Sequence, residues 1–197
     1  YNTTSTVLKG FGQIGTGAWA SGGTMAISSA LRYGFGTQGA AGMAAGNNNT
    51  TGATELYNGT AWTTGNNVND PRESGASCGT QTAAIMTAGE TPAETGNTET
   101  FDGTSWTEVN DLQTATSDMG AVGTVTSGLI FGGAIPGYTA QTESYNGTAW
   151  SEVADLNSAR GVLGGFGSSN IDAMAAGGTP NTGITEAWNG TSWTEVA

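Results

Sequence analysis

The segment Tyr145-Asn-Gly-Thr-Ala-Trp150 decides the fold, because the chain carries four versions of it. The other three are Tyr57-Asn-Gly-Thr-Ala-Trp62, Phe101-Asp-Gly-Thr-Ser-Trp106 and Trp188-Asn-Gly-Thr-Ser-Trp193. Their closing tryptophans follow one another at intervals of 44, 44 and 43 residues. A period near 44 residues is typical of units of four short strands, as in propeller blades, although helical arrays share that length.

A second marker repeats with the same period. Glycines ten residues apart bracket short stretches of small residues, at Gly36 and Gly46, Gly79 and Gly89, Gly123 and Gly133, and Gly167 and Gly177. The repeats are rich in Gly, Thr and Asn, which are poor helix formers, and no segment has apolar residues at helical spacing. The sequence therefore predicts an all-β protein whose buried strands include Ala83–Ala88, Ser127–Phe131 and Ala173–Ala176.

The Asn-Gly and Asp-Gly pairs predict the hairpin of each unit. Such a pair between alternating strands favours a two-residue type I′ turn, in which both turn residues have positive φ. In the first unit this turn places Tyr57 opposite Thr60 and Glu55 opposite Trp62. Glu55, Tyr57 and Trp62 are then expected on one face of the hairpin, because side chains two residues apart on a strand point the same way.

Composition excludes several classes of function. The 197 residues include 16 acidic and four basic residues, one cysteine and no histidine. Without histidine, Ser-His-Asp and Cys-His catalytic centres and histidine metal sites are ruled out. The single Cys78 is interpreted as a small buried residue. The net charge of −12 argues against nucleic-acid binding, and no apolar run approaches the ~20 residues that span a bilayer.

The chain is predicted to be a single repeat domain over residues 1–197. Its repeats are expected at 36–70, 71–113, 114–157 and 158–197, with irregular strands at 1–35. Gly12 and Gly22 show the ten-residue spacing, yet Gly36 follows Gly12 after only 24 residues. The N-terminal strands are expected to complete the last unit or to form a shortened fifth unit, because closing the ring in this way removes exposed sheet edges.

These motifs resemble the kelch-type β-propeller repeat, in which a diglycine ends a hydrophobic strand and a Tyr and then a Trp follow. Gly132-Gly133 and Gly177-Gly178 match the diglycine. The segments 102–109 (DGTSWTEV) and 146–153 (NGTAWSEV) are similar to Gly/Thr/Asn-rich repeats of phage tail-fibre-like and marine bacterial surface proteins. The resemblance covers about residues 36–197 and implies a kelch-like β-propeller of four to five small four-stranded blades.

A glutamate recurs two residues before the first aromatic residue of each motif, at Glu55, Glu99, Glu143 and Glu186. These carboxylates are interpreted as structural, with hydrogen bonds to the backbone or a paired arginine. The alternative is an acidic ring that binds calcium or a sugar. Arg72 and Arg160 each lie ten residues after a closing Trp, where the third unit has Thr116, so arginine pairing is not expected in every unit.

The closing tryptophans Trp62, Trp106, Trp150 and Trp193 are interpreted as core residues, because they occur in every unit. Ligand contacts are expected where the sequence departs from the repeat, since loops carry function on a fixed scaffold. Trp19 and Tyr138 are predicted to break the repeat and to contact ligand, together with Asn47, Asn48 and Asn49. The variable connections are Asn47–Gly52, Glu90–Gly96, Ala134–Gln141 and Thr179–Gly183.

Asn-X-Ser/Thr sequences raise the alternative of N-glycosylation, at Asn2, Asn48, Asn49, Asn58, Asn146 and Asn189. For the hairpin positions, turn chemistry is the favoured interpretation. Asp102, which cannot be glycosylated, stands at the same position of the second motif, and Asp-Gly suits the same turn as Asn-Gly.

The function predicted from these features is a non-enzymatic structural or adhesion module of a virion. It would be a phage tail-fibre-like or capsid-appendage protein that acts in assembly or in host-surface attachment. No cofactor, catalytic residue or metal ligand is predicted. The expected partners are other virion or surface proteins, a host-surface glycan and further copies of the chain, on a virion or at an extracellular surface. A secreted carbohydrate-active propeller enzyme and a kelch-type protein–protein adaptor are the alternatives.

Overall fold

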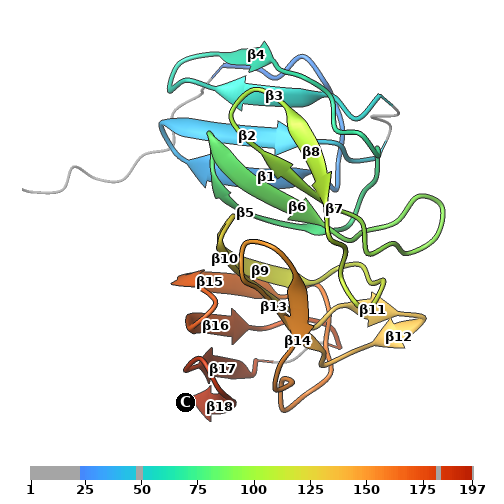
Figure 1. Ribbon diagram of the computed structural model, residues 1–197, viewed down its shortest axis with the longest axis vertical. Helices are drawn as coiled ribbons and strands as arrows, with labels where there is room; N and C mark the ends of the chain where they lie inside the picture. Colours follow the sequence, from blue (N-terminus) through green and yellow to red (C-terminus); the bar gives the residue numbers. More distant parts are fainter. Residues whose placement is uncertain (1–22, 48–50, 181–182, 197) are drawn as a thin grey trace, which may run out of the picture.

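The computed structural model describes residues 23–47, 51–180 and 183–196. These residues form four antiparallel sheets of four strands each and one short two-stranded ribbon (Figure 1). No helix occurs in the described ranges. The prediction of an all-β chain is therefore confirmed.

In every sheet the strands lie in chain order, each antiparallel to the next. Sheet 1 consists of β1 (Tyr33–Thr37), β2 (Ala40–Ala44), β3 (Thr54–Tyr57) and β4 (Trp62–Thr64). Sheet 2 consists of β5 (Ala76–Thr80), β6 (Ala83–Thr87), β7 (Thr98–Phe101) and β8 (Trp106–Val109). Sheet 3 consists of β9 (Gly120–Thr124), β10 (Ser127–Phe131), β13 (Thr142–Tyr145) and β14 (Trp150–Glu152), and the ribbon of β11 (Ala134–Ile135) and β12 (Gly137–Tyr138) is inserted into it. Sheet 4 consists of β15 (Gly164–Ser169), β16 (Asp172–Ala176), β17 (Thr185–Trp188) and β18 (Trp193–Val196).

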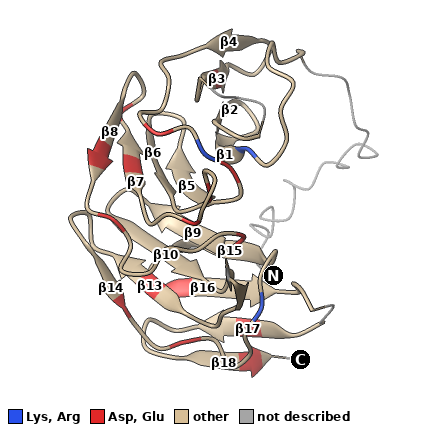
Figure 2. Cartoon of the chain, turned by 90° about the vertical axis from the view of Figure 1, so that its right-hand side faces the viewer, with Lys and Arg blue, Asp and Glu red and all other residues tan. Residues whose placement is uncertain are grey.

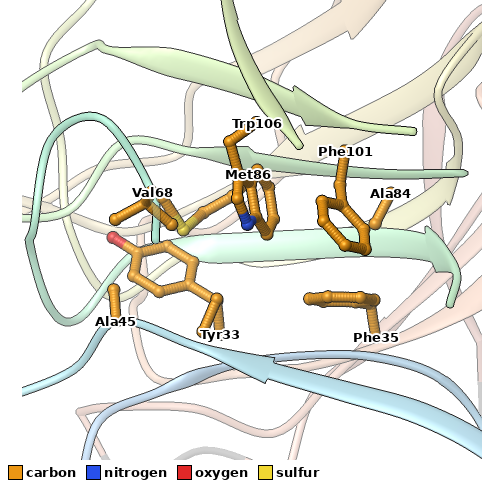
Figure 3. Packing of buried hydrophobic residues seen from close by; sticks show 9 residues of the cluster. Tyr33, Phe35, Ala45, Val68, Ala84, Met86, Phe101 and Trp106 are labelled. Atoms are coloured by element: carbon orange, nitrogen blue, oxygen red, sulfur yellow. The ribbon is translucent and has the colours of Figure 1, made fainter. Parts of the chain in front are cut away.

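The sheets pack side by side through their first strands, so that β1 contacts β5, β5 contacts β9, and β9 contacts β15. They follow an arc, with sheet 1 at the top and sheet 4 at the bottom of Figure 2. An apolar cluster fills each of the three interfaces. In the first, shown in Figure 3, the Phe35 ring of sheet 1 lies 6.0 Å from that of Phe101 and 5.8 Å from that of Trp106 in sheet 2.

The closing tryptophan joins each sheet to the one before it. The indole N–H groups of Trp106, Trp150 and Trp193 donate to threonine hydroxyls at the start of the preceding sheet's third strand: Thr54 at 2.8 Å, Thr98 at 3.2 Å and Thr142 at 3.2 Å. All six of these residues are buried. Because a buried indole N–H needs an acceptor, this bond fixes how neighbouring sheets stack. Trp62, on the end sheet of the described arc, is only partly buried.

The predicted two-residue turns are wrong in their geometry. Tyr57 pairs with Trp62 and Glu55 with Thr64, so the first loop contains four residues, 58–61. In this loop the side-chain oxygen of Asn58 accepts the backbone N–H groups of Thr60 and Ala61. This side-chain bond makes a wider turn that needs a positive φ only at the glycine. Asp102, Asn146 and Asn189 make the same pair of bonds.

Two successive residues with positive φ follow the second strand of every sheet: Ala45-Gly46, Ala88-Gly89, Gly132-Gly133 and Gly177-Gly178. The first position tolerates alanine, at φ values of 48° and 58°. The second is glycine in all four sheets, because a Cβ there would approach a backbone oxygen, at 2.3 Å in the case of Gly89. The diglycine of the repeat is thus one required glycine preceded by a left-handed residue.

Candidate functional site

Four residues with left-handed backbone form a hydrogen-bonded series across the four sheets. Leu31, Ser74, Asp118 and Val162 precede the first strands and have φ values between 52° and 58°. The N–H of each donates to the carbonyl of the one before, from Ser74 to Leu31 at 3.4 Å, from Asp118 to Ser74 at 2.6 Å and from Val162 to Asp118 at 2.7 Å. A non-glycine residue in this conformation costs about 1–3 kcal/mol, so the surrounding structure must hold it.

A pocket of about 400 Å³ opens at this series, and its lining comes mainly from the connections that lead into the four sheets. It is lined by Leu31, Arg32, Ser74, Gly75, Asp118, Met119, Val162, Leu163 and Gly164. Leu31 and Val162 are exposed, and burial raises the pKa of Asp118 above its ordinary 3.8. Asp118 is the one carboxylate among these lining residues. The pocket therefore offers polar and apolar surface in about equal parts, and Asp118 is its one acidic group.

The four repeated glutamates are buried and lie outside this lining. Each accepts backbone N–H groups from the connection that leads into its own sheet. Glu99, for example, accepts N–H groups from Asn69 at 2.7 Å and Asp70 at 3.2 Å. Corresponding bonds run from Ala26 and Ile27 to Glu55, from Gln113 and Thr114 to Glu143, and from Asn157 to Glu186. The carboxylates thus hold the connections between sheets in place.

Three of these glutamates also bind the three arginines of the chain. The ion pairs are Arg32–Glu55 at 2.6 Å, Arg72–Glu99 at 2.9 Å, and Arg160–Glu186. All six side chains are almost fully buried. Sequence analysis missed Arg32, because it lies three places later in the repeat than Arg72 and Arg160. It reaches the equivalent carboxylate from a different backbone position.

The presence or absence of arginine gives two of the glutamates opposite pKa shifts. Glu143 has no arginine, and burial raises its pKa above the ordinary 4.5 despite two backbone N–H donors. Burial also acts to raise the pKa of Glu186, but the bonds from Arg160 and Asn157 outweigh it and the pKa falls below 4.5. Thr116, at the arginine position of sheet 3, donates to the Ala134 carbonyl instead.

The structure places two of the predicted ligand residues beside the pocket. Tyr138, on β12, is 46% exposed, and a Cβ on Gly161 would lie 3.2 Å from its ring. The Asn47 side-chain oxygen accepts the N–H of Ala30 at 3.0 Å. Because Ala30 and Gly161 adjoin Leu31 and Val162 in the chain, Tyr138 and Asn47 lie at the end of the sheets where the pocket opens. Trp19, Asn48 and Asn49 lie outside the described residues.

The left-handed series could not be found from residue types. Its four members are Leu, Ser, Asp and Val, and only Asp commonly adopts this conformation. The only feature of the sequence that could have revealed the series is its spacing, because the four residues follow the repeat at intervals of 43, 44 and 44 residues.

Two other hollows lie apart from the left-handed series. One of about 400 Å³ lies between sheets 2 and 3, beside Phe101 and Tyr145. A smaller one of about 70 Å³ includes Asp70, Glu99 and Glu108. There Asn97 donates to Asp70 and Arg72 to Glu99, so these two carboxylates already have partners. No group of three or more potential metal ligands occurs within the described ranges.

No family model matches the chain, and a search of curated proteins finds no relative. In the part of the chain that the structure describes, no helix has the length and apolarity needed to cross a membrane.

Proposed function

We propose that the chain is a kelch-like β-propeller module of a virion, without enzymatic activity, that acts in assembly or in attachment to a host surface. Four-stranded meander sheets whose first strands lie side by side are the arrangement expected of propeller blades. The phage tail-fibre-like pattern of segments 102–109 and 146–153 supports the virion assignment. A composition of 10% charged residues with many Thr and Asn fits an extracellular setting.

One observation carries the non-enzymatic part of the proposal. The four repeated glutamates are buried and bonded to the connections between sheets, and three of them bind arginine. Glycoside hydrolysis commonly needs two carboxyl groups on either side of the scissile bond. Asp118 is the one carboxylate that lines the pocket at the left-handed series. This supports a binding module over the carbohydrate-active enzyme.

The proposed binding surface is the rim of the pocket. Tyr138 offers an exposed aromatic ring, and Leu31 and Val162 add apolar surface that is 53% and 65% exposed. An amphipathic ring stacks well on the apolar face of a sugar, and Asp118 accepts hydrogen bonds from hydroxyl groups. A host-surface glycan is therefore the proposed ligand class.

A glycan array with product analysis tests this proposal. The labelled chain is expected to retain glycans without releasing cleaved products. Replacing Gly137–Thr139 with Gly-Ser-Gly is expected to weaken retention, whereas Thr60→Ala, in a turn at the opposite end of β3, is the matched control. Product release would contradict the non-enzymatic assignment. Equal retention by the Gly-Ser-Gly variant would contradict the choice of surface.

A further inference from the structure

An amide side chain bridges neighbouring sheets at the turn between their first and second strands. Gln81 of sheet 2 donates its Nε2–H to the carbonyl of Tyr57 in sheet 1 at 2.7 Å. Asn170 of sheet 4 donates its Nδ2–H to the carbonyl of Tyr145 in sheet 3 at 3.3 Å. Each amide holds the first position of a two-residue turn, and each acceptor is the last residue of a third strand. The same bridge thus occurs at two of the three interfaces.

The interface between sheets 2 and 3 lacks this bridge. Val125 holds the turn position of the two amides, and Phe101 is the counterpart of the two tyrosines. The valine side chain has no N–H to donate, and no side chain among the described residues donates to the Phe101 carbonyl. Val125 and Phe101 both line the hollow of about 400 Å³ between these sheets. The missing amide therefore leaves a hollow beside a main-chain acceptor.

The lining of this hollow includes partly buried apolar residues and exposed polar residues. Val109 and Val125 are partly buried and pack against the apolar cluster between sheets 2 and 3. Thr82, Asp102 and Thr107 are exposed and offer two hydroxyl groups and a carboxylate. Small-molecule sites have volumes of about 300–1,000 Å³ and combine apolar surface with a few polar groups. The hollow therefore has the size and the mixture of groups that suit a small ligand.

Three requirements narrow the class of ligand. It must donate an N–H to the Phe101 carbonyl, as the amides of Gln81 and Asn170 do at the other interfaces. It must place a small apolar group against Val109 and Val125, because burial of that surface is favourable. It must also carry hydroxyl groups for the polar oxygens of the lining. An acetamido sugar meets all three, whereas a plain sugar lacks the first two and a glutamine side chain lacks the third.

We propose that the hollow between sheets 2 and 3 binds an N-acetylated hexosamine. The acetamido N–H donates to the Phe101 carbonyl, and the acetyl methyl group packs on Val109 and Val125. The sugar hydroxyls form hydrogen bonds with Thr107 and Asp102. The hollow shares no lining residue with the pocket at the left-handed series. It is a second sugar site, and the inference does not depend on the ligand proposed for the pocket rim.

Titration of the full chain with N-acetylglucosamine tests the site. The methyl NMR signals of Val109 and Val125 are expected to shift and to saturate as the sugar is added. Glucose, which has no acetamido group, is expected to bind at least tenfold more weakly, a factor that corresponds to about 1.4 kcal/mol. Equal binding of the two sugars would overturn the proposal. Equal shifts with acetamide alone would also overturn it and would assign the hollow to an amide side chain of a partner polypeptide.

The variant Val125→Gln supplies the missing amide from the chain itself. The new side chain is expected to donate to the Phe101 carbonyl and to fill the hollow, so that N-acetylglucosamine no longer shifts the Val109 signals. Ile171→Gln, in the corresponding turn of sheet 4, is the matched control, because Ile171 is 66% exposed and lies outside the hollow. It is expected to leave binding unchanged. Unchanged binding by folded Val125→Gln would contradict the proposed site.

A second variant keeps the test decisive if Val125→Gln does not fold, which the signal of the fully buried Met86 methyl group reports. Thr107 is exposed on β8, so Thr107→Ala removes a hydroxyl without emptying a core position. It is expected to weaken N-acetylglucosamine binding about threefold or more, and equal affinity would count against the proposal. Replacing Gly137–Thr139 with Gly-Ser-Gly is expected to leave this titration unchanged, so the two sugar sites are tested separately. Conversely, Val125→Gln allows glycan retention at the pocket rim to be measured alone.

Discussion

Replacing Trp106 with alanine should destabilise the chain far more than the same change at Trp62. Trp106 is 6% exposed, lies 5.8 Å from the ring of Phe35 in the preceding sheet and 4.9 Å from that of Phe101, and donates to Thr54. Emptying such a site costs about 3–5 kcal/mol. Trp62 keeps the equivalent ring contact, with Tyr57 at 5.0 Å, but it is only partly buried. Its loss should cost about 1 kcal/mol, an average effect for a single substitution.

Thermal unfolding followed by circular dichroism measures this difference. For a chain of this size, about 1 kcal/mol corresponds to roughly 2–4 °C in Tm, so Trp106→Ala should lower Tm by roughly 6–20 °C and Trp62→Ala by roughly 2–4 °C. Trp106→Phe separates the two contributions, because it keeps most of the packing and loses the N–H; it should cost about 1–2 kcal/mol. Equal losses for the two alanine variants would refute the argument that the closing tryptophan stabilises the interface between sheets.

The other predictions concern pH, the thiol and the turns. The pKa of Glu186 falls below 4.5, so its contribution to stability is present above that pH and is lost on acidification. Urea unfolding should therefore show that Glu186→Gln is less stable than the unaltered chain at pH 7. The difference in the free energy of unfolding should shrink below pH 4.5. The raised pKa of Glu143 reverses the sign, so the unaltered chain should lose stability relative to Glu143→Gln as pH rises above 4.5. Burial raises the pKa of Cys78 from 9.0 to about 12, so less of this thiol is ionised, and it should react with iodoacetamide much more slowly in the folded chain than in urea at the same pH. Asp102→Asn should leave Tm nearly unchanged, since asparagine makes the same turn at residue 58, and a large loss would contradict the side-chain turn.

The repeat was enough to predict the four sheets, but it did not predict the length of the hairpin loops. A period shared by Trp and Gly markers is enough to predict four equivalent units, because each unit must bury the same face against the next. The predicted type I′ turn was wrong because the side-chain oxygens of Asn58 and Asp102 accept backbone N–H groups within the loop. The preference of Asn-Gly for a type I′ turn considers only backbone dihedral angles. The register Tyr57–Trp62 follows from the longer loop.

The site was predictable only in part. Tyr138 departs from the repeat, and the structure places it beside the pocket. The left-handed series at Leu31, Ser74, Asp118 and Val162 has no common side chain, because its role depends on backbone geometry. Arg32 was missed for a related reason: its guanidinium reaches Glu55 from another repeat position, and only the folded path of the chain shows that the two groups meet.

Hydrogen exchange of the indole N–H groups, followed by NMR in deuterated water, tests most directly whether closing tryptophans join successive sheets. The indoles of Trp106, Trp150 and Trp193 are bonded to threonine hydroxyls of the preceding sheet and are expected to exchange slowly. Trp188, bonded to the Asn170 carbonyl, should also be slow. Trp62 is expected to exchange fast, because it is partly exposed and lies on the end sheet of the arc. Exchange of Trp106, Trp150 and Trp193 as fast as that of Trp62 would contradict the stacked arrangement.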